Sequence, residues 1–425
     1  MIMKLVETHI IKPSDKRYDE ADNLCFLSKN LYNASNYAIR QHFFKTGSYL
    51  SYASLNKMFT DDNQVDYRSL PAKVSKGTQR KLDKNWKSYF KASVDYQKHP
   101  EKYTGRPRIP KYLDKSGRYL VHYEKGALSF KRKGYIKLSK TNIYIKTNIS
   151  VDDVLFVDIV HSGHHIKFLV GYYQEISDVM QNDEHRYASI DLGINNLMTV
   201  TSNVVAPVIF NGKPVKSINQ YANKMNSKFT SLKAEAVNNK DNEKVDYYDK
   251  KLQKLWLKRN NKINDYMHKS SNMLVNHLVS NEISLLVIGK NEFWKQDSNI
   301  GKQNNQNFVS IPYNRLLQMI EYKCLLKGIA VVYTEESYTS KASFLDNDDI
   351  PVYQKGSDET HNFSGKRACR GLYRTKNNKY INADVNGSLN ILKKYLSKNE
   401  AWNNQLWLDC VERCSNVTIR KISIV

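Results

Sequence analysis

The chain has 425 residues, enough for two or three domains, and its 66 Lys and Arg against 42 Asp and Glu give a formal net charge of +24. This excess indicates a polyanionic partner, either nucleic acid or an anionic membrane surface. The sequence has neither an apolar run of about 18 residues nor a signal-peptide pattern, so we expect a soluble, cytoplasmic protein without a membrane partner.

The first half of the sequence has strand patterns at both ends and helical patterns between them. Residues 2–12 alternate between apolar and polar, which predicts a strand. Helical spacing follows at about 19–44, 52–58 and 75–96. After the Pro- and Gly-rich segment 104–112, short strand patterns between 119 and 173 predict a small barrel or sandwich, which the first strand could join.

The helix at 75–96 has a basic face, which we interpret as a contact surface for a nucleic-acid backbone. A solvated helix surface would show the same pattern. The residues that we select on this face are Lys76, Arg80, Lys84 and Lys87.

Two groups of metal-ligand residue types are interpreted as structural. The sequence HSGHH at 161–165 is interpreted as a hairpin tip, because no carboxylate or thiol lies at ligand spacing from it. The five cysteines are scattered, and Cys410 and Cys414 supply only half of the usual zinc ligand set. We therefore expect neither a disulfide framework nor a zinc site.

The second half has the order of elements that is typical of an RNase H-like α/β domain. Strands are predicted at 187–191, 197–202 and 205–210, before a long charged helical region at about 217–280. The order continues with a strand at 284–288, a helix at 312–327, a strand at 329–334, a loop-rich insert to about 380 and a helix at 383–396.

Acidic residues at the ends of two of these elements are candidate metal ligands. Such domains hydrolyse phosphodiesters with two metal ions held by carboxylates, and Mg²⁺ suits these ligands. Asp191 ends an apolar strand and is followed by Gly193, which allows a sharp turn with room for ions. Asp384 lies in the first turn of the last helix, where it could also serve only the helix dipole. We predict that both are catalytic metal ligands.

Several segments of the chain resemble the TnpB family, whose members are carried by bacterial insertion sequences and are ancestors of type V CRISPR effectors. The segments are IDLGINNL, YKCLLKGI, ESYTSK and ADVNGSLNIL in the second half, and LPAKV and TGRPRIPKY in the first. The resemblance spans nearly the whole chain. It implies a wedge-type β-barrel, an inserted helical recognition domain and a RuvC-like nuclease domain. It also implies a guide RNA from the transposon end and a double-stranded DNA target with a short flanking motif.

The expected architecture is therefore an α+β multidomain protein. Residues 1–16 and 104–180 would form the wedge-like β-barrel, with 17–103 as the inserted helical domain. Residues 184–398 would form the RuvC nuclease domain, with 337–380 as an insert that lacks zinc ligands, and 399–425 a C-terminal tail. Such a bacterial protein would associate with the nucleoid when bound to DNA.

The sequence departs from the TnpB pattern at the second carboxylate and at the zinc ribbon. The strand LLVIG ends in Gly289 where Glu is expected, and no cysteine follows the TS of ESYTSK. Adjacent strands lie about 5 Å apart, so a carboxylate from the neighbouring strand's end could fill the space beside Gly289. We predict that Glu336, or otherwise Glu335, replaces the lost ligand. Glu292 is a weaker candidate, and two solvated acids at a loop start are the structural alternative.

The loops beside this site are rich in Asn and Lys. We predict backbone and stacking contacts to nucleic acid for Lys290, Trp294 and Lys295, although a solvated loop is equally compatible with the pattern.

The function that these residues and the resemblance favour is transposon-encoded, RNA-guided DNA cleavage by two Mg²⁺ ions at guide-matched targets. A nuclease-dead, RNA-guided DNA-binding protein would share the fold and the charge. A transposase that acts in insertion-sequence transposition is the other alternative, although the sequence contains no HUH motif with a Tyr nucleophile.

Overall fold

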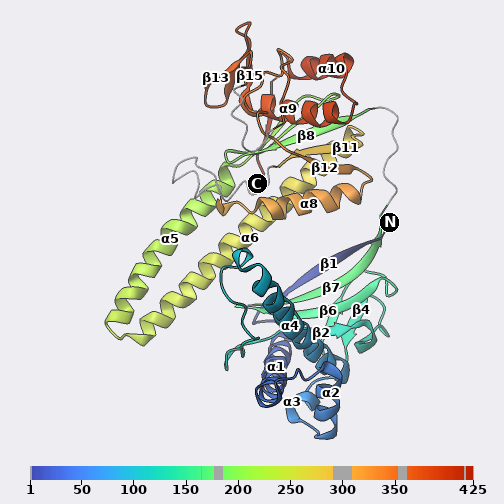
Figure 1. The fold of residues 1–425 in the computed structure, drawn as a ribbon, viewed down its shortest axis with the longest axis vertical. Coiled ribbons are helices and arrows are strands. Elements are labelled where there is room, and N and C mark those ends of the chain that lie inside the picture. The colour runs from blue at the N-terminus through green and yellow to red at the C-terminus, as the bar shows by residue number, and fades with distance from the viewer. Residues whose placement is uncertain are drawn as a thin grey trace. The chain divides into compact units, whose positions relative to one another are not determined.

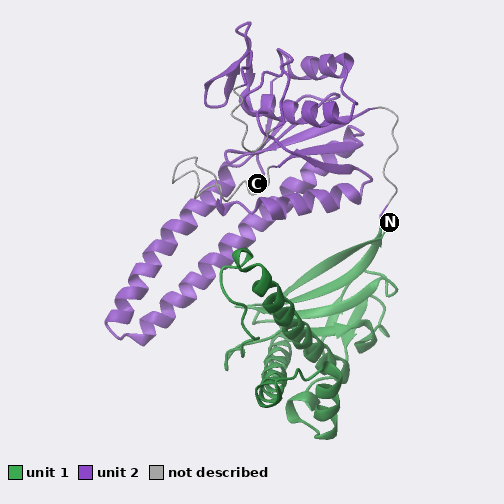
Figure 2. Ribbon diagram, in the orientation of Figure 1, with its two compact units in different colours: residues 1–175 green, residues 176–425 purple. Residues whose placement is uncertain are grey.

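A computed structural model of the chain describes residues 2–163, 165–176, 185–290, 309–352, 361–415 and 418–424. The chain divides into two compact units, residues 1–175 and 176–425 (Figures 1 and 2). Both units combine helices and strands, which confirms the predicted α+β class. Among the described helices, none is long and apolar enough to cross a membrane.

Unit 1 is built on an antiparallel sheet in which the first strand of the chain pairs with the last strand of the unit. The strand order is β1 (Ile2–Ile11), β7 (His165–Glu175), β6 (Val154–Ser162) and β2 (Val121–Glu124). A second sheet contains β3 (Leu128–Ser129), β4 (Tyr135–Leu138) and β5 (Tyr144–Lys146). The first strand therefore pairs with the later ones, as the sequence predicted. The strands described in unit 1 make two separate ladders, and their closure into a barrel stays a prediction.

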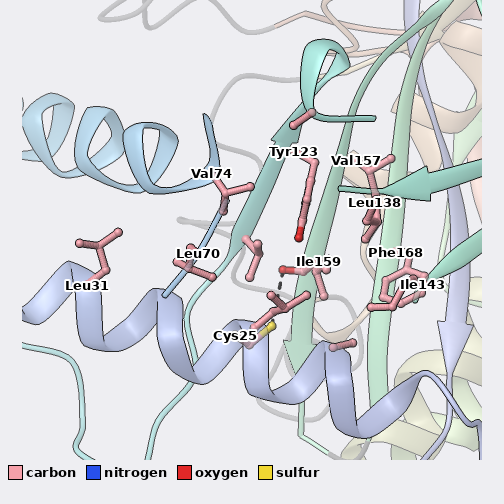
Figure 3. Packing of buried hydrophobic residues seen from close by; sticks show 14 of the residues in the cluster. Cys25, Leu31, Leu70, Val74, Tyr123, Leu138, Ile143, Val157, Ile159 and Phe168 are labelled. Atoms are coloured by element: carbon pink, nitrogen blue, oxygen red, sulfur yellow. Dashed lines mark hydrogen bonds between the residues drawn. The ribbon is translucent and has the colours of Figure 1, made fainter. Parts of the chain in front are cut away.

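Helices fill the sequence between β1 and β2, and the two longest of them pack on the larger sheet. They are α1 (Tyr18–Thr46), α2 (Tyr52–Asp61), α3 (Val65–Arg68) and α4 (Ala72–Lys98), followed by the short η1 (Pro100–Lys102), while η2 (Lys125–Ala127) follows β2. Figure 3 shows Cys25 of α1 beside Ile159 of β6, where Cys25 Sγ contacts the carbonyl oxygen of Ile159 at 3.9 Å. Trp86 of α4 is fully buried and donates from Nε1 to Asn36 Oδ1 at 3.0 Å. The helical segment thus shares one core with the sheet.

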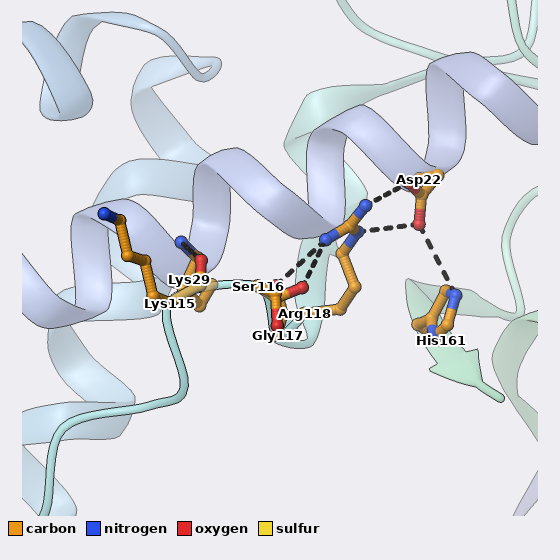
Figure 4. Close-up of polar contacts among 7 residues, drawn as sticks. All are labelled: Asp22, Lys29, Lys115, Ser116, Gly117, Arg118 and His161. Atoms are coloured by element: carbon orange, nitrogen blue, oxygen red, sulfur yellow. Dashed lines mark hydrogen bonds and ion pairs between the residues drawn. The ribbon is translucent and has the colours of Figure 1, made fainter. Parts of the chain in front are cut away.

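A polar cluster fastens α1 to the segments around it (Figure 4). Arg118 donates to both carboxylate oxygens of Asp22, at 2.8 and 2.6 Å. His161 Nε2 lies 3.5 Å from the same carboxylate. Ser162 and His165 form the last pair of the β6–β7 ladder, so the described residues of HSGHH lie at the end of a hairpin, as predicted.

Unit 2 contains a mixed sheet of six strands in the order β12 (Ala330–Thr334), β11 (Leu285–Gly289), β8 (Tyr187–Leu192), β9 (Asn196–Ser202), β10 (Val208–Asn211) and β16 (Arg420–Ile422). Strands β8, β11 and β12 are parallel, and β9 is antiparallel to β8. One face of the sheet packs on α9 (Ala383–Lys398) and α10 (Asn404–Cys414), and the other on α6 (Asn242–Ser280) and α8 (Tyr313–Leu325) (Figure 1). The predicted order of three strands and then alternating helices and strands is present in the described residues.

Three features of unit 2 differ from the sequence expectation. The helical region at 217–280 is two helices, α5 (Lys213–Asn238) and α6, because Lys240 adopts a φ of 55° and the Asp241 side chain caps α6. The segment 399–425, expected to be a tail, contributes α10 and the edge strand β16. The insert carries a small sheet of β13 (Lys366–Cys369), β14 (Leu372–Arg374) and β15 (Tyr380–Asn382).

Candidate active site

Three of the predicted acidic residues come together at one edge of the unit 2 sheet. Because β8, β11 and β12 are parallel, their carboxyl ends meet at the same edge. The register pairs Ile190 with Ile288, so Asp191 of β8 lies next to the end of β11 at Gly289. Glu336 follows the end of β12 by two residues.

Buried hydroxyl groups fix α9 against this edge. Ser189 Oγ on β8 donates to the carbonyl oxygen of Ser388 at 2.7 Å, and Ser388 Oγ donates to Ser189 O at 3.2 Å. A Cβ on Gly387 would lie 3.0 Å from Asp191 Oδ2, so the carboxylate packs directly on the helix. Asp384 is one turn before Gly387 on the same face, which brings it to Asp191's side of the helix.

Gly289 leaves the space that Glu336 occupies. A Cβ at Gly289 would lie 2.8 Å from Glu336 Oε2 and 2.5 Å from Ile391 Cδ1. Both distances are shorter than ordinary van der Waals contacts, so neither a Glu nor an Ala fits here without displacement. The close approach agrees with the predicted placement of a neighbouring-strand carboxylate beside Gly289.

Glu335 points away from this space and is engaged elsewhere. It accepts a hydrogen bond from the buried Lys394 at 2.5 Å and another from Ser337 N at 2.5 Å. Although burial opposes it, these hydrogen bonds lower the pKa of Glu335 below its usual value. Of the two adjacent acids, the structure therefore brings Glu336 to Asp191 and pairs Glu335 with a lysine.

Asp384 is held by an interaction that the sequence did not indicate. Asn196 Nδ2 donates to Asp384 Oδ2 at 2.6 Å, and Lys421 Nζ of β16 donates to Asn196 Oδ1 at 3.2 Å. Asn382 caps α9 by accepting from Asp384 N at 2.9 Å. Asn196 lies in the IDLGINNL segment, but its role depends on residue 421, which is remote in sequence.

The carboxylates at this edge are close enough to repel one another. Burial raises the pKa of Asp191 well above its usual range, and the carboxylates of Glu336 and Asp384 raise it further. Arg367 of β13 opposes this rise. Burial, with the nearby charge of Glu335, raises the pKa of Glu336 to about 7. These carboxylates therefore need either protons or a cation to be stable together.

The donor set is suited to a hard divalent cation, because it consists of carboxylate oxygens from three separate segments. Within the described ranges, however, no three His, Cys, Asp or Glu side chains are grouped closely enough to hold a metal ion. The carboxylates thus share an electrostatic environment without forming a closed coordination shell.

The two asparagines that follow Asp384 on α9 do not face the carboxylates. Asn386 and Asn390 are fully buried and donate to the carbonyl oxygen of Ala342, at 2.8 and 2.7 Å. Asn390 also donates to Thr339 O at 2.8 Å. They fasten the segment after Glu336 to the helix that carries Asp384.

The predicted basic face of α4 is partly neutralised within unit 1. Arg80 pairs with Glu124 at 2.7 Å, and Lys87 pairs with Asp83 at 2.7 Å. Lys84 is exposed and Lys76 is half-buried, and neither has an ion pair with any described residue. Their contact with nucleic acid stays a prediction.

The loop after β11 is only partly within the described residues. Lys290 is exposed, and its Nζ lies 5.4 Å from the centre of the Tyr333 ring. Trp294, Lys295 and the alternative acid Glu292 lie outside the described ranges.

Comparison with protein families gives two matches between residues 172 and 391. Residues 172–294 match the family model OrfB_IS605, described as a probable transposase. Residues 313–391 match the model of the Cas12f1-like TNB domain.

Individual proteins show similarity over most of the chain or a smaller part of it. The TnpB-like protein ORF457 of Acidianus two-tailed virus is 23% identical over 426 residues, which cover 91% of this chain and 86% of that protein. The CRISPR-associated endodeoxyribonuclease Cas12f2 of a Micrarchaeota archaeon is 35% identical over 88 residues, 21% of this chain and 15% of that protein.

Two solved structures are similar to the chain at low sequence identity. A Cas12f1–sgRNA–target DNA complex has 14% identity and a TM-score of 0.31, covering 91% of this chain and 98% of that chain. The mini-RNA-guided endonuclease CRISPR-Cas_phi3 has 10% identity and a TM-score of 0.46, covering 92% of each chain.

Proposed function

We propose that this chain, which belongs to the TnpB family, is a metal-dependent endonuclease that cuts DNA at sites selected by a guide RNA. The observation that carries the proposal is the approach of Asp191, Glu336 and Asp384 at the carboxyl edge of one sheet. Carboxylates from separate segments at such an edge are what two-metal phosphodiester hydrolysis requires.

Mg²⁺ is the proposed cofactor, with Asp191, Glu336 and Asp384 as its protein ligands. When bound, the metal supplies an activated water and stabilises the leaving oxygen. The raised pKa of Asp191 supports this assignment, because three clustered carboxylates gain the most from a divalent cation. Their side chains must draw closer than they stand in the structure. Asn196 would orient Asp384, and Gly289 would leave room for Glu336.

The net charge of +24 supports nucleic-acid partners, since base pairing can supply sequence specificity while the protein binds the backbone. The partners that we propose are a guide RNA and a double-stranded DNA target. The similarity of 88 residues to a CRISPR-associated endodeoxyribonuclease supports DNA as the substrate.

The test is guided cleavage by matched carboxylate variants. The protein would be purified with the RNA transcribed from its own locus, the RNA sequenced, and cleavage of a matched plasmid measured in Mg²⁺. We expect Glu336→Gln and Asp191→Asn to lose at least about 100-fold in cleavage rate, more than the loss of an outer-shell group, with RNA binding unchanged. Glu335→Gln, the matched control, should stay within about tenfold of the wild type, since Glu335 pairs with Lys394.

The outcomes of this test distinguish guided cleavage from guided DNA binding and from transposition. Recovery of no discrete RNA would contradict the guided model. Bound RNA without cleavage by the wild type would leave a guided DNA-binding protein. Excision of element ends by the protein without RNA would indicate a transposase instead.

A further inference from the structure

Unit 1 contains a basic, aromatic cavity of about 500 Å³ between the start of α1 and the strands β4 and β5. Asp15 contributes the one carboxylate among its described lining residues. The residues that matter for its chemistry are Lys16, Arg17, Arg132, Lys146, Tyr135 and Tyr144.

The alternation of β4 and β5 explains why tyrosines and lysines gather on one face. Ile136 and Ile145 point into the core and are almost fully buried. Their neighbours therefore point to the opposite face, where the ladder pairs Tyr135 with Lys146. Lys137 is paired with Tyr144 in the same way, so aromatic rings and ammonium groups are neighbours across the two strands.

The charge of this face is positive and largely unpaired. Residues 131–146 contain six Lys and Arg and no Asp or Glu. Lys16, Arg132 and Lys146 make no ion pair with another residue of the described ranges. Arg17 is the exception, because it donates to Asp15 at 2.6 Å. Four cations thus face one carboxylate that is already paired, which leaves a surplus of positive charge in the cavity.

A guanidinium plane and aromatic rings lie beside these charges. The Arg132 guanidinium lies 4.0 Å from the centre of the Tyr135 ring, and its side chain is exposed. Tyr144 is 37% exposed, and its carbonyl oxygen accepts a hydrogen bond from Arg17 at 2.9 Å. The backbone beneath Tyr144 is therefore held in place, while part of the side chain remains accessible.

We propose that this cavity binds a single-stranded nucleic-acid segment, with phosphates at Lys16, Arg132 and Lys146 and a base stacked on Tyr144. Phosphates complement the unpaired cations. A duplex hides the faces of its bases, whereas unpaired bases stack on aromatic rings and guanidinium planes. The inference rests on the proposed function for the presence of such strands, which are the guide RNA or the displaced DNA strand.

The test compares charge variants that differ only in whether they line the cavity. Arg132→Gln with Lys146→Gln removes two cations from it. Lys131→Gln with Lys133→Gln removes two cations from the same basic segment outside it. Binding of the full chain to labelled single-stranded RNA and DNA of about 20 nucleotides, and to duplex DNA, would be measured between about 50 and 200 mM salt.

For the cavity variant we expect a single-strand affinity about tenfold below that of the Lys131/Lys133 control, with a salt slope smaller by about 1.4 for two lost phosphate contacts. Tyr144→Leu should weaken single-strand binding about tenfold and leave duplex binding unchanged. A larger effect on RNA than on DNA would assign the site to the guide, and the reverse would assign it to the displaced strand.

Equal losses in the two charge variants would overturn the proposal, because the cavity would then be ordinary surface charge. So would unchanged single-strand binding by a Tyr144→Leu protein whose circular dichroism matches the wild type. These binding assays involve no cleavage, so a failure of the cleavage proposal would be visible separately from a failure of this one.

Discussion

The sharpest prediction concerns the pH dependence of folding at Glu336. Burial and the charge of Glu335 raise the pKa of the Glu336 carboxyl from 4.5 to about 7. At about 1.4 kcal/mol per pH unit, this difference corresponds to about 3 kcal/mol, an upper figure because the side chain keeps some solvent contact. The folded protein holds this proton more tightly than the unfolded chain. Stability is therefore lost as the pH rises from about 4.5 to about 7.

Glu336→Gln removes the charge and with it this pH-dependent loss. We expect the variant and the wild type to unfold with similar free energies near pH 4.5, and the variant to be more stable by up to about 3 kcal/mol near pH 8. The Glu336 carboxylate also raises the pKa of Asp191, so its removal lowers that pKa and further favours the variant at high pH. The assay is urea unfolding without divalent ions, with hydrogen exchange at α9 to identify the unit 2 transition.

Glu335→Gln is the matched control, and its effect on folding stability should depend on pH in the opposite way. Its pKa is lowered by the hydrogen bond from Lys394, so its stabilising contribution is present above about pH 4.5 and lost as the pH falls. The variant should therefore be less stable than the wild type at neutral pH. A stability difference for Glu336→Gln that is the same at pH 4.5 and pH 8 would refute the reasoning.

Two further predictions concern packing and orientation at the same edge. Gly289→Ala should cost about 1–3 kcal/mol in urea unfolding, because its Cβ would lie 2.5 Å from Ile391 Cδ1. Adding Ile391→Val, which removes that methyl group, should recover part of the lost free energy of unfolding. If the double variant lost the sum of the two single losses, this explanation would be contradicted. Lys421→Met should lower guided cleavage about tenfold at unchanged RNA binding, because Asn196 loses the contact that orients it toward Asp384. Lys421→Arg should restore the rate, and wild-type cleavage by Lys421→Met would exclude such a role.

The parts of the site that the sequence predicted are those set by local patterns. An apolar strand that ends in Asp and an Asp in the first turn of a helix place Asp191 and Asp384 without knowledge of their partners. The pairing of Gly289 with Glu336 required only that two neighbouring strands end at the same edge. Strand alternation did not indicate whether Glu335 or Glu336 faces the other carboxylates. The contact of Lys394 with Glu335 distinguishes the two.

The parts that the sequence did not predict depend on contacts between distant residues. Lys421 reaches Asn196 only because β16 joins the sheet beside β10, a pairing of three residue pairs that no local pattern marks. The turn between α5 and α6 contains neither Gly nor Pro, so Lys240 and Asp241 gave no strong signal for it. Asn386 and Asn390 have the spacing of ligands but serve a buried contact instead.

The buried contact of Asn386 and Asn390 affects how the acid side of a pH–rate profile should be interpreted. Asn386 and Asn390 tie α9 to the segment after β12 through amide groups, which neither gain nor lose protons across the working range. These amide contacts therefore persist as the medium is acidified, whereas the pairing of Lys394 with Glu335, which joins the same two segments, weakens. In Glu335→Gln, where that ion pair is already absent, a fall in turnover at low pH would report protonation of the site carboxylates rather than a loosening of the frame that carries them.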